Sequence, residues 1–224
     1  MVALIPALIV KNQKRWENMH IKANRLPELH RRGAILCAPE NKVRYQGVTA
    51  RLQELNKTDP TIVAVPWWFI AIVSEREYGG PPHWDKQLGQ GDALGAVSHN
   101  EPAGRGPFLT HSWDTTPTVA NPVRADDAWT RCCLDALIDC DPHAARWTNW
   151  TPGGTATIFE EYNGIGYALK GVPSAYVWSG SDQYVSGKYV ADHVYRAGVI
   201  DVQEGCMPLL GAMMAIDPTI KFAA

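Results

Sequence analysis

Apolar side chains recur at helical spacing in the first part of the chain, whereas the lysines and arginines there lie largely off the apolar stripe. The apolar positions between residues 4 and 26 are Ile5, Leu8, Ile9, Trp16, Met19, Ala23 and Leu26. A period close to 3.6 residues indicates an amphipathic helix. Pro27 interrupts this helix or opens the next one, and a further short helix is predicted over residues 41–56.

The most apolar stretch is VPWWFIAI, residues 65–72. Residues 67–77 are apolar on nearly all faces, which predicts a helix that passes through the core rather than lying on its surface. Pro66 suits the first turn, where a missing N–H group costs nothing. The segment then places Glu75, Arg76 and Glu77 at its end and breaks into a Gly-Gly-Pro-Pro run.

Residues 79–125 are dense in Gly and Pro and keep no helical period, so a small irregular lobe is expected there, with room for a β-hairpin. Helical patterns return at residues 126–140, 152–162 and 199–216, and residues 171–197 are rich in aromatic residues and Gly. We find no internal repeat or linker. The sequence therefore predicts one mainly α domain over residues 1–224 with a small irregular or β lobe.

Charge is unevenly distributed along the chain. Residues 1–57 hold eleven Lys and Arg against four Asp and Glu, whereas residues 58–224 hold ten against nineteen. A basic N-terminal helical part, residues 1–58, can face an anionic polymer, although a solvated helix face explains it equally simply. No dense Lys/Arg block with interleaved aromatic residues is present, so we expect no nucleic-acid partner.

Three of the five cysteines, Cys132, Cys133 and Cys140, fall in an apolar helical pattern and are interpreted as buried small hydrophobes. No histidine pair has metal-ligand spacing, and neither a nucleophile elbow nor a phosphate-binding loop is present. No cofactor and no metal are therefore expected. Residues 2–10 lack the flanks of a signal peptide, and no stretch is long enough to span a membrane, so a cytoplasmic location is expected.

The two carboxylates at the end of the apolar helix are candidates for acid catalysis. Burial disfavours the charged form of a carboxyl group and raises its pKa, as the general acid of a glycosidase requires. Glu75 and Glu77 point about 200° apart on a helix, so only one of them can face a cleft. A surface charge or a structural salt bridge remains the alternative for either residue.

Six short motifs in order carry a resemblance to a known family. They are VPWW at residue 65, ERE at 75, QGD at 90, GRGPF at 104, YNGIGY at 162 and GKYV at 187. The chain resembles the lysozyme superfamily, in particular goose-type lysozymes and lytic transglycosylases, and more closely phage- and prophage-type cell-wall lysozymes. The resemblance covers roughly residues 60–216 and implies a lysozyme-like helical domain. Tyr78 departs from the family, which commonly has a small residue there.

The resemblance implies roles for particular residues. By resemblance Glu77 becomes the catalytic acid, with Glu75 as its rival. Asp92, fifteen residues later in the irregular lobe, is a candidate base for water, with Asp85 as a weaker candidate. Asp92 is equally an ordinary turn residue after Gly91, and substrate assistance by an N-acetyl group needs no second carboxylate. The substrate-binding residues would be Gln90, Tyr162 and Asn163, with aromatic faces from Tyr176, Trp178, Tyr184 and Tyr189. Asn163 also fits an ordinary helix stop before Gly164.

Together these observations predict a peptidoglycan-cleaving muramidase, either a hydrolase or a lytic transglycosylase, whose partner is the glycan strand of the bacterial wall. A monomer is expected, stored in the cytosol and released at host lysis as an endolysin, or associated with the virion. A chitinase- or chitosanase-like glycosidase is the enzymatic alternative. A non-catalytic wall-binding phage structural module is the alternative from another class.

Overall fold

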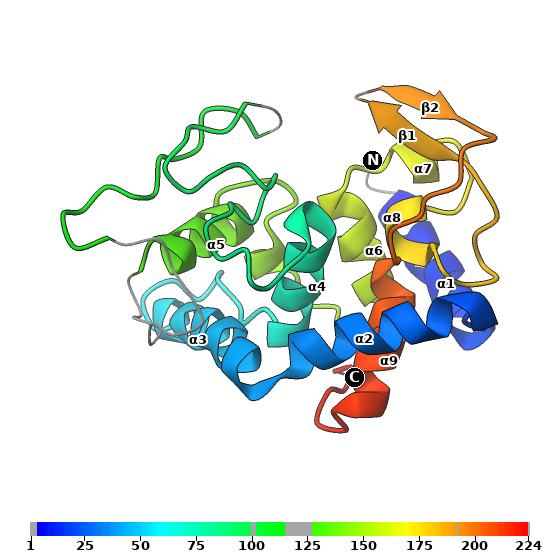
Figure 1. Cartoon of the computed structure of the whole chain (residues 1–224), viewed down its shortest axis with the longest axis horizontal. Coiled ribbons are helices and arrows are strands. Elements are labelled where there is room, and N and C mark those ends of the chain that lie inside the picture. The colour runs from blue at the N-terminus through cyan, green and yellow to red at the C-terminus, as the bar shows by residue number, and fades with distance from the viewer. Residues whose placement is uncertain (1–3, 100–101, 115–126, 192, 224) are drawn as a thin grey trace. The chain divides into compact units, whose positions relative to one another are not determined.

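The computed structural model describes residues 4–99, 102–114, 127–191 and 193–223. Within these ranges the chain forms nine α-helices, two short 3-10 helices and one two-stranded sheet (Figure 1). The prediction of a mainly α protein with a small β part is confirmed. The α-helices are α1 Leu4–Glu17, α2 Leu26–Cys37, α3 Pro39–Asn56, α4 Trp67–Tyr78, α5 Ala128–Ile138, α6 Pro152–Tyr162, α7 Gly166–Leu169, α8 Ala175–Trp178 and α9 Cys206–Ile216.

The chain groups into two compact units. Unit 1 consists of Met1–Ala34 with Asn149–Ala224, and unit 2 consists of Ile35–Thr148. Each has its own buried apolar core.

Unit 1 is built on the pair α1 and α6, which pack along each other. Gly153, in the first turn of α6, makes this approach possible, because a Cβ atom there would lie 2.4 Å from the Ile9 carbonyl oxygen. Asn12 of α1 is fully buried and donates to the Thr157 hydroxyl at 3.2 Å. Thr151 caps α6 by accepting from the Gly154 N–H at 3.2 Å, a standard way to satisfy a free helix donor.

The sheet of unit 1 is a hairpin of β1 Lys188–Ala191 and β2 Val194–Arg196 (Figure 1). The antiparallel register pairs Lys188 with Arg196 and Tyr189 with Tyr195. Tyr167 of α7 packs edge-on against Tyr189 with ring centroids 5.0 Å apart, and its hydroxyl accepts the Tyr189 N–H at 3.1 Å. This aromatic packing attaches the hairpin to the helical part of the unit.

Unit 2 is built around α4, which packs against α3. Every residue from Trp68 to Ser74 is buried, as the apolar pattern predicts. Beneath its C-terminal half lies an aromatic cluster in which Trp84 meets Trp129 edge-on at 5.0 Å and Tyr45 at 5.4 Å. Each such pair stabilises the fold by roughly 0.5–1.5 kcal/mol beyond the burial of the rings. The aromatic cluster therefore helps to fix the C-terminal half of α4.

The predicted helices over residues 41–56, 67–77, 126–140 and 152–162 are confirmed as α3, α4, α5 and α6. The long N-terminal pattern ends as a helix at Glu17, and the last helix begins only at Cys206. In the irregular lobe, the described residues contain an isolated bridge between Lys86 and Ala93. None of the helices that the structure describes has the length and apolarity to cross a lipid bilayer.

Candidate functional site

The C-terminal turn of α4 carries the two candidate acids and ends in a well-formed cap. Gly79 adopts a left-handed conformation with φ 84°, and its N–H donates to the Glu75 carbonyl at 3.0 Å. The Gly80 N–H donates to the Ser74 carbonyl at 3.0 Å. This double closure is the common glycine stop of a helix, and it fixes the position of the last turn.

Both carboxylates on this turn are half-buried, whereas Arg76 between them is buried with 8% of its surface exposed. Glu75 and Glu77 therefore lie at the boundary between core and solvent, which is where a general acid can meet a polymer. The two carboxylates therefore share the same degree of burial, and both are more exposed than Arg76.

Tyr78 follows Glu77 in place of the small residue of the resembling family. Its hydroxyl accepts the Trp129 indole N–H at 3.2 Å, and burial raises its pKa well above the usual 10. One turn earlier, Ser74 exchanges a hydrogen bond with Tyr45 at 3.0 Å. The tyrosine therefore anchors the end of α4 to α5, and the departure at this position has a structural reason.

The QGD turn lies directly against the end of α4. Gly91 has φ 71°, and a Cβ atom there would stand 2.9 Å from the Glu77 carbonyl oxygen and 3.2 Å from Tyr78. Only glycine fits this position, because both the left-handed conformation and the close approach exclude a side chain. The structure thus places Gly91, which stands between Gln90 and Asp92, against the backbone of Glu77 in unit 2.

Asp92 takes part in the internal order of this turn. Its backbone carbonyl accepts the Gln87 N–H at 2.7 Å, and its carboxylate accepts the His99 backbone N–H at 3.3 Å. The His99 ring nitrogen lies 3.4 Å from the other carboxylate oxygen. About a quarter of the Asp92 side chain remains exposed, so the residue both organises the loop and presents a carboxylate to solvent.

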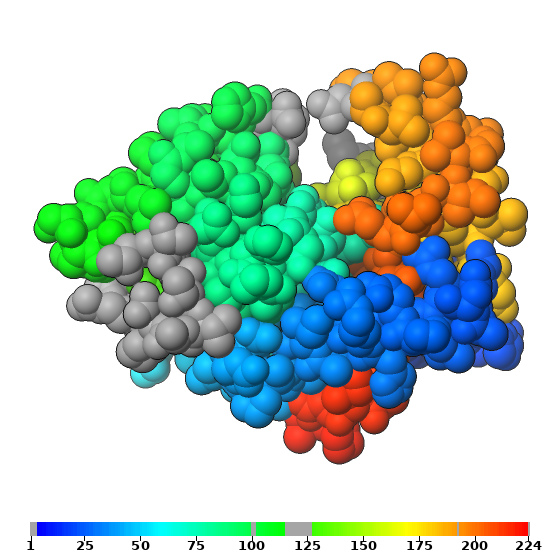
Figure 2. All heavy atoms as spheres, in the orientation of Figure 1, coloured from blue at the N-terminus to red at the C-terminus, as the bar shows by residue number. Residues whose placement is uncertain are grey.

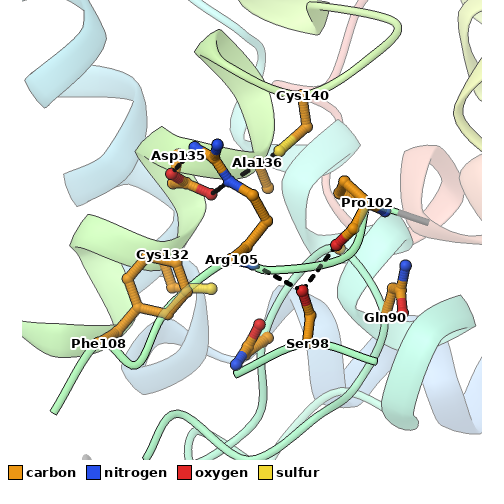
Figure 3. A pocket seen from close by; sticks show the side chains of 11 residues that line it. Gln90, Ser98, Pro102, Arg105, Phe108, Cys132, Asp135, Ala136 and Cys140 are labelled. Atoms are coloured by element: carbon orange, nitrogen blue, oxygen red, sulfur yellow. Dashed lines mark hydrogen bonds and ion pairs between the residues drawn. The ribbon is translucent and has the colours of Figure 1, made fainter. Parts of the chain in front are cut away.

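Two residues of the GRGPF motif, Arg105 and Phe108, line a small hollow that Gln90 also lines (Figure 3). Arg105 donates through Nε to Asp135 of α5 at 2.9 Å and forms a second, very short contact through Nη2. The Ser98 hydroxyl accepts the Arg105 N–H and donates to the Pro102 carbonyl. The hollow measures about 10 Å³, room for roughly one water molecule. The motif therefore ties the irregular lobe to α5 and leaves no space for a sugar there.

The cysteines of this region are poor nucleophiles. Cys132 and Cys133 are buried in α5, and Cys140 is buried just beyond it. Burial raises the pKa of Cys132 to about 12 and that of Cys140 to about 11. Both thiols therefore stay protonated near neutral pH. Because the thiolate is the reactive form, they are poor nucleophiles, and their interpretation as small core residues is supported.

Tyr162 and Asn163 end α6 in unit 1. Tyr162 is half-buried and Asn163 is exposed. The left-handed conformation of the helix stop falls on Gly164, with φ 88°, whereas Asn163 keeps a right-handed conformation with φ −87°. The stop therefore needs Gly164 and does not need the Asn163 side chain, which leaves that amide available for another role.

Three of the other predicted sugar contacts in unit 1 lie in its core, whereas Tyr189 of β1 is half-buried. Tyr176, Trp178 and Tyr184 are 4%, 0% and 1% exposed. The Tyr184 hydroxyl donates to the Gly187 carbonyl at 3.1 Å and accepts the Asp201 N–H at 3.0 Å. Buried rings cannot stack on a sugar, so these three residues belong to the core of unit 1.

One unusual acid was missed by the sequence reasoning. Glu160 of α6 is completely buried, and neither carboxylate oxygen makes a well-aligned hydrogen bond with the described residues. Burial raises its pKa to about 7, against the opposing effects of Arg15, Asn12 and Lys11 of α1. A signal for this position was present, because Glu160 lies seven residues after Gly153 and therefore on the same face of α6.

Comparison of the chain with protein-family models, curated proteins and solved structures gives no match. Over the described residues, no group of three His, Cys, Asp or Glu side chains is arranged to hold a metal ion. The function must therefore be argued from the motifs and from the geometry of each unit.

Proposed function

We propose that this protein is a muramidase that cleaves the glycosidic bond between N-acetylmuramic acid and N-acetylglucosamine in peptidoglycan. One observation carries the proposal. A half-buried carboxylate lies at the end of a largely apolar helix, and a glycine-dependent turn bearing Gln90 and Asp92 lies against that helix end. This gives unit 2 an acid at the edge of the core with polar groups beside it.

In this proposal Glu77 protonates the glycosidic oxygen as the bond to the anomeric carbon breaks. Asp92 then takes a proton from the attacking water, as the base of an inverting glycosidase does. The alternative route uses the N-acetyl group of the substrate, and Asp92 then serves only to shape the loop. Gln90 offers an amide that can donate to and accept from sugar hydroxyls.

We also propose an endolysin or virion-associated role, in which the enzyme reaches the wall from a bacterial cytosol at lysis or from a phage particle. The wall polymer is anionic. The basic N-terminal part of the chain can contribute to attraction at low ionic strength.

The test is wall clearing followed by mass analysis of the released fragments. Glu77→Gln should keep the fold and reduce clearing by at least 10²–10⁴-fold, the usual contribution of general acid catalysis. Glu75→Gln is the matched control, with the same chemical change two residues away, and it should retain most activity. Reducing ends on the fragments indicate hydrolysis, and 1,6-anhydro ends indicate transglycosylation.

Several results would decide against the proposal. An inactive Glu75→Gln variant beside an active Glu77→Gln variant moves the acid to the other face of α4. Walls left intact by the wild-type protein, with retained binding, favour a wall-binding module. Cleavage of chitin or chitosan without cleavage of peptidoglycan favours the related glycosidases.

A further inference from the structure

Unit 2 displays an aromatic surface outside the site described above. The Trp113 side chain is 41% exposed, and its ring stacks on that of His111 with centroids 4.6 Å apart and planes 23° from parallel. The guanidinium carbon of Arg131 lies 5.4 Å from the Trp113 ring centroid. We call His111 and Trp113 the aromatic platform. It belongs to residues 102–114, which lie at the surface in green in Figure 2.

A buried carboxylate holds the platform in place. The Asp114 side chain is 2% exposed and accepts the backbone N–H groups of Thr110 and His111, both at 2.8 Å. It also accepts from Arg131 of α5 at 2.7 Å, and the same Arg131 nitrogen donates to the Phe108 carbonyl at 2.7 Å. Burial raises the pKa of Asp114, but these hydrogen bonds outweigh that effect and lower the pKa to about 2. The carboxylate therefore stays ionised, and the loop is ordered before any ligand arrives, which reduces the entropic cost of binding.

An open hollow of about 370 Å³ lies next to the platform, because two of its lining residues, Thr110 and Arg131, contact His111 and Trp113 respectively. Its lining mixes apolar and polar residues. The apolar residues are Pro107, Phe108, Leu134 and Ile138, and the polar residues include Thr110 and Asp139. The volume falls at the lower end of the range for small-ligand sites, so the hollow suits one ring rather than an extended side chain.

The charges around the hollow select against an anionic ligand. Arg131 is paired with Asp114, and Arg105 is paired with Asp135. Asp139, whose side chain is 60% exposed, adds a further negative charge to the lining. A phosphate or carboxylate group would therefore meet no net positive field here. A neutral ring with one apolar face and a polar rim matches the aromatic platform and the mixed hollow.

We infer that the aromatic platform and its neighbouring hollow form a sugar subsite that binds a neutral N-acetylhexosamine ring of a glycan strand. This inference rests on the proposed function and adds a subsite to it, away from Glu77 along the chain. The exposed part of the Trp113 ring contacts the apolar face of the sugar, and Thr110 and Asp139 form hydrogen bonds with its polar groups. The subsite contributes to holding the polymer and takes no part in the chemical step.

Isothermal titration calorimetry with the N-acetylglucosamine pentamer tests this inference on the full chain. Trp113→Ala should weaken binding at least tenfold, because the stacking face is lost. Trp113→Tyr keeps a flat ring and should bind within threefold of the wild-type protein. Trp147→Ala is the matched control, since it removes another partly exposed tryptophan of unit 2, and it should bind within twofold. Circular dichroism of each variant verifies that the fold is retained.

The inference fails if Trp113→Ala binds like the wild-type protein, if Trp147→Ala loses as much affinity, or if the wild-type protein shows no binding. Tighter binding of the glucosamine pentamer, which carries amino groups in place of acetamido groups, would also overturn it. These outcomes are separate from wall clearing by Glu77→Gln. An inactive Glu77→Gln variant with unchanged binding by Trp113→Ala removes the subsite and leaves the muramidase proposal standing.

Discussion

Replacing Glu160 with glutamine isolates the effect of one buried acid on the stability of unit 1. An ordinary glutamate has a pKa of 4.5, and burial raises the pKa of Glu160 to about 7. Between these two values the folded protein holds a proton that the unfolded chain has released. Stability therefore falls as the pH rises from about 4.5 to about 7, and it stays lower above that window.

The size of this effect follows from the two pKa values. At about 1.36 kcal/mol for each tenfold change in acidity, they correspond to about 3 kcal/mol of unfolding free energy across the window. Solvent does not screen this interaction appreciably, because the side chain is 0% exposed. Glutamine is neutral at every pH and has nearly the same shape, so Glu160→Gln should remove this component of the pH dependence.

Urea unfolding at pH 4.5, 5.5, 6.5 and 7.5, followed by circular dichroism, measures the difference. At pH 4.5 the two proteins should agree within about 1 kcal/mol, because Glu160 is protonated in the folded protein and only about half-ionised in the unfolded chain. By pH 7.5 the variant should be more stable by about 2–3 kcal/mol. Glu54→Gln is the control, since Glu54 is an exposed partner of Lys57 and such pairs contribute about 1 kcal/mol or less.

Two results would refute this reasoning. Parallel stability curves for the wild-type protein and Glu160→Gln would mean that Glu160 titrates near its ordinary pKa. A loss of about 3–5 kcal/mol in the variant at pH 7.5 would mean that Glu160 forms a strong buried ion pair with Arg15, because breaking such a pair leaves an uncompensated charge.

The remaining predictions address the candidate site and its surroundings. Asp92→Asn should lower turnover more than tenfold, about 1.4 kcal/mol of barrier, with wall binding unchanged; a smaller loss, measured on purified walls, favours substrate assistance. Cys132→Ala should lower stability by roughly 0.5–1.5 kcal/mol through a small cavity and leave specific activity intact, and inactivation of the folded protein by a thiol reagent would contradict this. Tyr162→Phe and Asn163→Ala should each raise the barrier to wall cleavage by about 1–3 kcal/mol with little change in melting temperature; two fully active variants would leave these residues with no role beyond the end of α6.

The helices were predictable because each has a strong local signal. Helix α4 combines an all-apolar stretch, Pro66 at its start and Gly79 at its end, and its observed bounds differ from the prediction by one residue. The hairpin of β1 and β2 was not located, because strands of four and three residues are too short for alternation to stand out from a Gly-rich and aromatic background. Aromatic residues were the hardest to assign, because the sequence pattern does not distinguish a tryptophan in the core, such as Trp178, from one at the surface, such as Trp113.

A raised pKa and accessibility to substrate fall on different carboxyl groups of this protein, although the sequence analysis expected both on the same residue. That reasoning sought a carboxylate whose pKa burial would raise, and among the described glutamates and aspartates Glu160 shows this most clearly, with a pKa of about 7. Yet Glu160 has no exposed surface, so a glycan strand cannot reach it without local opening of the α1–α6 pair. The pKa of a general acid must be raised, and its carboxyl group must also reach the glycosidic oxygen. The half-buried end of α4 presents an accessible carboxyl group, whereas Glu160 does not. Accessibility therefore favours Glu77 over Glu160 as the acid, and the stability measurement on Glu160→Gln, beside the activity measurement on Glu77→Gln, tests that division of roles directly.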